Sequence, residues 1–184
     1  DLGEENRYIF GFEESYGYLA GSYVRDKDAV VASMLICEMA AFYRTKGISL
    51  LQARENMYAK YGVYKHSQQS FTCEGASGME RMKEIMSDLR IRTPEEIGGL
   101  KVTRFDDYLA SVSLDTATND KTMLTLPKSD VLAFMLTDGA SVVIRPSGTE
   151  PKIKAYYTTT GKTQAEAEAL EVKIADDFKK ILGF

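Results

Sequence analysis

The 184-residue sequence is poor in the residues that build metal centres and disulfide frameworks. It contains one histidine, His66, two cysteines, Cys37 and Cys73, and no tryptophan. A structural zinc site needs four Cys or His ligands, so this composition argues against a zinc protein. Because both cysteines lie in apolar or strand-like surroundings, we interpret them as reduced, buried thiols of a cytosolic protein and not as a disulfide.

The sequence also lacks an excess of positive charge and any long apolar run. It has 23 Lys and Arg against 27 Asp and Glu, a net charge of -4. This balance gives no electrostatic case for nucleic acid or an anionic membrane as partner. No stretch reaches transmembrane length and no signal peptide opens the sequence. We therefore expect a cytoplasmic protein, and the start at Asp1, directly before an apparent strand, suggests a piece of something longer.

The segment Arg145–Lys152 combines residues that suit an anion with several oxygens. It lies between two apolar runs and is predicted to be a loop joining two strands. Arg145 offers a planar fork of donors that matches phosphate or carboxylate. Ser147 and Thr149 add hydroxyl donors, and Gly148 lets backbone N–H groups approach an anion closely. The alternative is an ordinary polar turn, because turns favour the same residue types.

A second candidate site follows a predicted strand over residues 7–12. Glu13, Glu14 and Ser15 present two carboxylates and a hydroxyl between glycines. Carboxylates accept hydrogen bonds from sugar hydroxyls well, so this segment suits a sugar ligand. The alternative is a solvated acidic turn, because most charged residues are simply exposed.

The first third of the sequence predicts a strand, a loop and two helices. Residues 29–43 are nearly continuous in apolar residues, so we expect a well-buried helix. Asp26 and Asp28 precede this helix, and capping explains them, so we assign no metal to them. A second helix is predicted after Ser49, which has capping-box spacing with Gln52.

The remainder predicts one helix, several antiparallel strands and a final helix. Capping boxes mark both helix starts, at Ser77 with Glu80 and at Thr163 with Glu166. An Asp-Gly pair between two apolar runs, residues 131–136 and 141–145, predicts a hairpin. Residues 64–70 fit a linker or the start of a strand, and residues 106–130 show no clear pattern. The predicted fold class is α+β, an antiparallel sheet with helices on one face, preceded by a partial α/β domain.

Two motifs resemble the α-D-phosphohexomutase superfamily, which includes phosphoglucomutases and phosphomannomutases. The segment from Phe12 to Gly17 is similar to the sugar-binding loop of its third domain. Arg145–Lys152 is similar to the phosphate-binding loop of its fourth and last domain. Residues 11–18 and 24–29 resemble bacterial phosphoglucomutases and the related phosphopentomutase branch in particular.

The resemblance implies a domain division and a set of ligand contacts. Residues 1–62 would be the C-terminal remnant of the third domain, and residues 63–184 would be the fourth, phosphate-binding domain. Glu13 and Ser15 would bind sugar hydroxyls. The non-transferred phosphate of the sugar would be bound by Arg145, Ser147, Gly148 and Thr149.

The resemblance also implies chemistry whose residues this sequence does not contain. The family interconverts sugar 1-phosphates and 6-phosphates through a phosphoserine of the first domain and a bisphosphate intermediate. It uses Mg²⁺ on an Asp-rich loop of the second domain and a glucose 1,6-bisphosphate-type activator. We find neither motif here, so we assign no catalytic and no metal-binding residue and expect this piece to be inactive alone. Its partners would be a hexose phosphate and the N-terminal domains of the same protein.

Two other interpretations remain open from the sequence. One is a stand-alone phosphosugar-binding or regulatory module, against which the abrupt start at Asp1 argues. The other is a fragment of a phosphopentomutase of the same superfamily. The two motifs do not distinguish glucose, mannose and pentose phosphates, because epimers differ in geometry and not in the type of group that a loop contacts.

Overall fold

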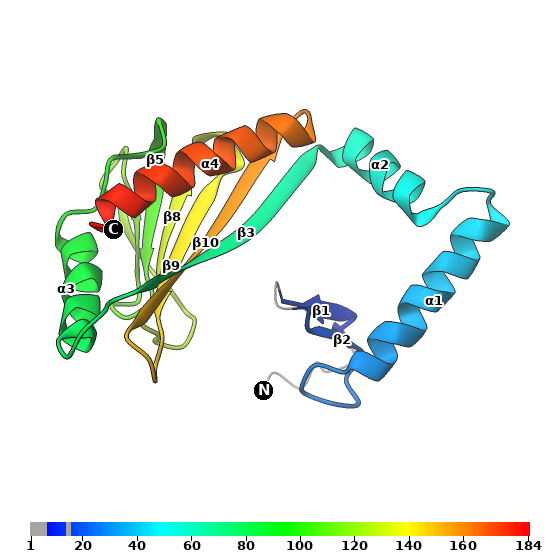
Figure 1. Ribbon diagram of the computed structural model, residues 1–184, viewed down its shortest axis with the longest axis horizontal. Coiled ribbons are helices and arrows are strands. Elements are labelled where there is room, and N and C mark those ends of the chain that lie inside the picture. Colours follow the sequence, from blue (N-terminus) through cyan, green and yellow to red (C-terminus); the bar gives the residue numbers. More distant parts are fainter. Residues whose placement is uncertain (1–6, 14–15) are drawn as a thin grey trace. The chain divides into compact units, whose positions relative to one another are not determined.

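The computed structural model describes residues 7–13 and 16–184 of the chain. Contacts divide the chain into two compact units, unit 1 (Asp1–Tyr61) and unit 2 (Gly62–Phe184). Figure 1 shows both units and labels most of their helices and strands.

Unit 1 consists of a short hairpin and two helices. Strand β1 (Phe10–Phe12) pairs antiparallel with β2 (Tyr18–Ala20), and the helices are α1 (Ala29–Thr45) and α2 (Leu50–Tyr61). The Asp28 carboxylate accepts hydrogen bonds from the N–H groups of Val30 and Val31 at 2.9 and 3.2 Å, which confirms it as the cap of α1. Ser49 accepts the Gln52 N–H at 3.1 Å and caps α2 in the same way.

The prediction that α1 is well buried is wrong for this chain. No residue of α1 is buried, and large side chains such as Val30, Met34 and Phe42 are exposed. Apolar residues cover most of its circumference, whereas its main neighbours in unit 1 are β2 and α2. The short strand β2 and the helix α2 are too small to cover the apolar surface of α1, so this surface stays exposed within the chain. Cys37 lies on α1 and is exposed, so only Cys73 is the buried thiol that the sequence predicted.

Unit 2 is built on an antiparallel sheet. Its described strands run in the order β3-β10-β9-β8-β5-β6-β7, and β4 pairs with β5. Their bounds are β3 (Val63–Thr72), β4 (Glu96–Ile97), β5 (Leu100–Asp107), β6 (Val112–Asp115), β7 (Lys121–Met123), β8 (Leu132–Leu136), β9 (Ser141–Pro146) and β10 (Lys152–Gly161).

Two helices, α3 (Gly78–Ile91) and α4 (Gln164–Ile181), cover one face of this sheet. Figure 1 shows α4 lying along β10 and β3, and the contacts agree. Along β10 the residues Ile153, Ala155 and Tyr157 alternate into one core with side chains from both helices. The structure therefore confirms the predicted α+β class with helices on one face.

The structure settles four local expectations for unit 2. The hairpin is confirmed, since β8 pairs with β9 across a 3₁₀ turn, Thr137–Gly139. Residues 64–70 belong to the ten-residue strand β3, and the unpatterned segment forms β6 and β7. The capping box at Ser77 is wrong, because the Ser77 side chain makes no cap hydrogen bond. Its backbone angles, φ -90° and ψ 7°, are not the extended ones from which a cap hydroxyl reaches the first turn.

The predicted cap of α4 at Thr163 is confirmed, with Glu166 binding one residue before the cap, and it yields a stability prediction. Thr163 accepts the Glu166 N–H at 3.2 Å, and the Glu166 carboxylate accepts the Lys162 N–H at 2.8 Å. Replacing Thr163 by Ala leaves a helix N–H without its partner, which costs about 1 kcal/mol. We expect urea unfolding of unit 2 to show this loss, whereas Thr125→Ala, at an exposed position outside any helix or strand, should change stability by less than about 0.5 kcal/mol. Equal effects of the two substitutions would refute the assignment of Thr163 as a cap.

Candidate functional site

The predicted phosphate loop is the turn between β9 and β10. Its shape is set by Ser147, whose N–H donates to the Lys152 carbonyl at 2.7 Å. The Ser147 hydroxyl accepts from the N–H groups of Thr149 and Glu150 at 3.4 and 3.3 Å. Lys152 forms an ion pair with Glu150 at 3.0 Å. The turn is thus ordered by its own residues, and the predicted ligands Arg145, Ser147, Gly148 and Thr149 lie together on it.

Gly148 is not required by packing within the described chain. A Cβ placed on this residue would meet no atom within 4 Å, and its φ lies outside the left-handed range. Gly148 and Thr149 are both exposed at the tip of the turn. An exposed backbone without a side chain is suited to close approach by a ligand.

Lys154 belongs to the same site, although the sequence analysis did not select it. The strand register pairs Arg145 directly with Lys154. Both residues alternate with buried neighbours, Ile144 on β9 and Ile153 on β10, so both point away from the core. Among the described residues neither cation has a carboxylate within ion-pair distance. Two like charges directly opposite each other repel and destabilise a sheet. An anion bound between the two cations would attract both of them and replace this repulsion by a net attraction.

An aromatic ring flanks the Arg145 guanidinium. Tyr156 lies two residues after Lys154 on the same face of β10, and the guanidinium carbon is 5.8 Å from the centre of its ring. This cation–π contact holds the arginine without neutralising its charge. The fork of donors is therefore oriented and still carries its full charge for an anion.

The start of α3 packs closely on the exit of the loop. The Cys73 N–H donates to the Pro151 carbonyl at 2.8 Å. A Cβ placed on Gly78, the first residue of α3, would lie 2.1 Å from the Cys73 carbonyl oxygen and 3.0 Å from Pro151 Cβ. Glycine at position 78 thus permits the close approach of α3 to the Cys73 carbonyl and brings the start of the helix next to Pro151.

A cavity of about 360 Å³ lies beside the loop, inside unit 2. One wall is the loop itself, a second is one face of α3, and a third is the segment before β8. Its lining residues are Met79, Met82, Lys83, Met86, Ser129, Asp130, Val131, Arg145, Pro146, Ser147 and Gly148.

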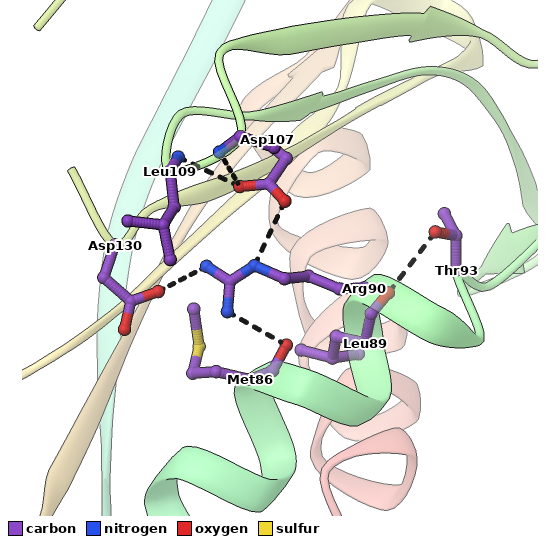
Figure 2. Close-up of polar contacts among 8 residues, drawn as sticks. Met86, Leu89, Arg90, Thr93, Asp107, Leu109 and Asp130 are labelled. Atoms are coloured by element: carbon purple, nitrogen blue, oxygen red, sulfur yellow. Dashed lines mark hydrogen bonds and ion pairs between the residues drawn. The ribbon is translucent and has the colours of Figure 1, made fainter. Parts of the chain in front are cut away.

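An ion-pair cluster around Arg90 holds the third wall in place (Figure 2). Arg90 donates through Nε to Asp107 at 3.1 Å and through the terminal Nη2 to Asp130. Asp107 also accepts the N–H groups of Leu109 and Ala110 at 3.0 and 3.2 Å. The sequence analysis missed the cluster because its members are separated by 17 and 40 residues along the chain.

The sugar-loop residues lie in unit 1. The Glu13 N–H donates to the Gly17 carbonyl at 2.9 Å, and its half-exposed carboxylate is 3.8 Å from Lys27. The Asp26 carboxylate, followed by that of Glu13, raises the pKa of Lys27. Glu14 and Ser15 lie outside the described residues, so the predicted role of Ser15 stays a prediction.

The described residues contain no group of three or more His, Cys, Asp or Glu side chains that could hold a metal ion. His66 contacts the Thr158 hydroxyl at 3.1 Å on β3, an edge strand of the sheet. None of the helices in the described part of the chain is long and apolar enough to cross a membrane.

Comparison with protein families gives two matches that follow each other along the chain. Residues 2–61 match the family model described as phosphoglucomutase/phosphomannomutase, alpha/beta/alpha domain III. Residues 80–177 match the one described as phosphoglucomutase/phosphomannomutase, C-terminal domain.

Curated relatives and a solved structure agree with the family matches. The chain is 38% identical over 157 residues to a phosphoglucomutase of Staphylococcus epidermidis, covering 85% of this chain and 29% of that protein. It is 39% identical over 157 residues to a phosphoglucomutase of Staphylococcus aureus, covering 85% and 28%. The chain thus spans less than a third of the length of these relatives. The fold is similar to that of the open form of pp63/parafusin, a phosphoglucomutase from Paramecium, with a TM-score of 0.62. The match covers 95% of this chain and 30% of the Paramecium chain, and the two sequences are 18% identical.

The Arg90 cluster predicts a large difference between two neighbouring arginines. The side chains of Arg90 and Asp107 are 21% and 11% exposed, whereas the Arg92–Asp88 pair is 75% and 59% exposed. Arg90→Met leaves a mostly buried carboxylate without its partner, so we expect a loss of about 2 kcal/mol in the free energy of unfolding. Arg92→Met removes a solvated pair and should cost less than about 0.5 kcal/mol. Urea denaturation of both variants measures the difference, and equal losses would contradict the structural role of Arg90.

Proposed function

The chain belongs to the phosphoglucomutase/phosphomannomutase family, and we propose that it is the C-terminal part of a phosphohexomutase and positions the substrate for phosphoryl transfer. In this proposal residues 1–62 are the remnant of the third domain and residues 63–184 are the fourth domain. The family matches over residues 2–61 and 80–177 support this division, as does the contact boundary after Tyr61.

Unit 2 binds the phosphate that is not transferred, through Arg145, Ser147, Gly148, Thr149 and also Lys154. The observation that carries this proposal is the direct pairing of Arg145 with Lys154, without an acidic partner for either among the described residues. A sugar phosphate is a dianion near neutral pH and compensates both charges. The exposed turn after Arg145 supplies hydroxyl and backbone donors to the remaining phosphate oxygens.

Unit 1 contributes acceptors for the sugar. Glu13 and Ser15 bind sugar hydroxyls, since an ionised carboxylate accepts their hydrogen bonds. The Glu13 carboxylate supports this role because it is half exposed, and its ion pair with Lys27, at 3.8 Å, is long. Its acceptor capacity is therefore largely available to a ligand.

In the proposed parent enzyme a phosphoserine passes its phosphoryl group to the free hydroxyl of the bound sugar phosphate. This step forms a sugar bisphosphate and a free serine. The bisphosphate then turns, and its other phosphoryl group returns to the serine. The loop binds whichever phosphate is not being transferred, so the same contacts serve both half-reactions, and positioning supplies much of the catalysis.

The other components of this reaction belong to the rest of the parent protein. The described residues offer no cluster of metal ligands, so the residues present do not fit the Mg²⁺ of the proposed reaction, and we derive no step through it. We assign the metal, the nucleophilic serine and the use of a glucose 1,6-bisphosphate-type activator to the N-terminal domains of a cytoplasmic enzyme.

This proposal predicts that the chain alone binds a sugar phosphate in an Arg145-dependent way. A charge-assisted contact contributes about 1.5–3 kcal/mol, so Arg145→Ala should weaken glucose 6-phosphate binding by about 10- to 100-fold. Arg92→Ala removes one positive charge from an exposed position at the C-terminal end of α3 and is the matched control. Isothermal titration or NMR titration measures both, and an unchanged Kd for Arg145→Ala would refute the assignment of the loop.

A second expected outcome concerns turnover. Because the chain has neither the nucleophile nor the metal loop of the proposed reaction, a coupled assay with glucose 1-phosphate and catalytic glucose 1,6-bisphosphate should give no product above the blank. Addition of the remaining domains of the parent enzyme, as a separate polypeptide, is the positive control. Turnover by the chain alone would disprove the positioning role.

A further inference from the structure

The face of α3 that lines the cavity carries one charge among three methionines. Met79, Met82, Lys83 and Met86 follow the spacing of one helical stripe, and all four line the cavity beside the loop. Met82 and Met86 are buried in the core, whereas Lys83 is exposed. The lysine therefore stands at the rim of an apolar wall, where its four-carbon stem can lie along methionine side chains with its ammonium group in the cavity mouth.

Lys83, like Lys154, has no acidic partner among the described residues. Lys152 pairs with Glu150, and Lys65 lies near Glu168 and Glu171. Within residues 7–13 and 16–184, Lys83 forms no ion pair and no side-chain hydrogen bond.

The carboxylate that shares the cavity with Lys83 is held by another residue. Asp130 lines the same cavity, but its oxygen is bound by Arg90, which also binds Asp107 (Figure 2). Asp130 therefore already has an ion-pair partner in Arg90. The cavity thus contains two cations without acidic partners among the described residues, Lys83 from α3 and Arg145 from β9.

We infer that Lys83 is a further binding residue for the phosphate of the sugar phosphate and approaches it from the α3 side of the cavity. The inference rests on the proposed function, because it takes the ligand to be the phosphate held by the loop. It adds a third cation to Arg145 and Lys154, contributed by a third element of unit 2. Gly78 brings the start of α3 close to Pro151 at the exit of the loop, which places Lys83, five residues further along α3, on the same side of the cavity as the helix.

Arg90 has a positioning role in this arrangement. It does not line the cavity itself, and it acts on the ligand only through Asp130. By binding Asp130 it leaves the ammonium group of Lys83 for the phosphate.

The test is a titration of the whole chain with glucose 6-phosphate, monitored by NMR. The titration is done at about pH 7.5, where the phosphate is dianionic. The variants are Lys83→Met, Lys83→Arg, Arg145→Ala and the control Lys162→Met. Lys162 is exposed and follows the far end of β10, about 30 Å along the strand from Lys152. Lys83→Met and Lys162→Met each remove one positive charge, so long-range electrostatics change equally. Methionine has a high helix propensity and matches the apolar stripe of α3. Because position 83 is exposed, we expect the Lys83→Met variant to fold like the original chain.

We expect Lys83→Met to weaken binding by about three- to tenfold, Lys162→Met to stay within about twofold of the original chain, and Lys83→Arg to restore most of the affinity. Equal affinities of Lys83→Met and Lys162→Met, with binding still dependent on Arg145, would overturn the role of Lys83 and leave the proposed function standing. If the original chain shows no Arg145-dependent binding, the proposed function fails and this inference fails with it.

Discussion

The register between β9 and β10 is the constraint on which both the core and the candidate site depend. Ile144 and Ala155 are paired and buried, which fixes the pleat of the two strands. The next pair along, Arg145 with Lys154, must then point to the opposite face. A slip of one residue in either strand would turn that strand's cation, Arg145 or Lys154, toward the core, so hydrophobic burial enforces the geometry of the candidate site. The same strand pairing also fixes the position of the turn between β9 and β10.

Sequence reasoning predicted the features that depend on local order. The loop at Arg145–Lys152, the hairpin before it and the cap at Thr163 are each specified by a few adjacent residues. It did not select Lys154, Lys83 or the Arg90 cluster, because these become neighbours only through strand register and the packing of α3 on the sheet. Burial of α1 was predicted wrongly for a related reason, since an apolar helix surface requires partners and the sequence does not say whether the same chain supplies them.

The two units differ in how they are stabilised. Within the described residues, every buried hydrophobic side chain belongs to unit 2, from Val63 to Leu182. Unit 1 has helix caps and a short hairpin but no comparable core, and its apolar surface stays exposed. The chain spans 29% of the length of a curated relative, so the interactions that bury a surface of this kind need not come from within the 184 residues. Unit 2 accordingly contains the hydrophobic core that independent folding requires.

The opposed cations on β9 and β10 represent a trade-off between folding and discrimination. A neutral residue at either position would remove the repulsion between the two side chains and stabilise the sheet. Natural proteins retain destabilising local features of this kind mainly at functional sites. If the proposed function holds, the repulsion between Arg145 and Lys154 contributes to ligand selectivity. A dianion would gain from both charges at once, whereas a free sugar would gain from neither, so the unliganded protein would already favour a phosphorylated sugar.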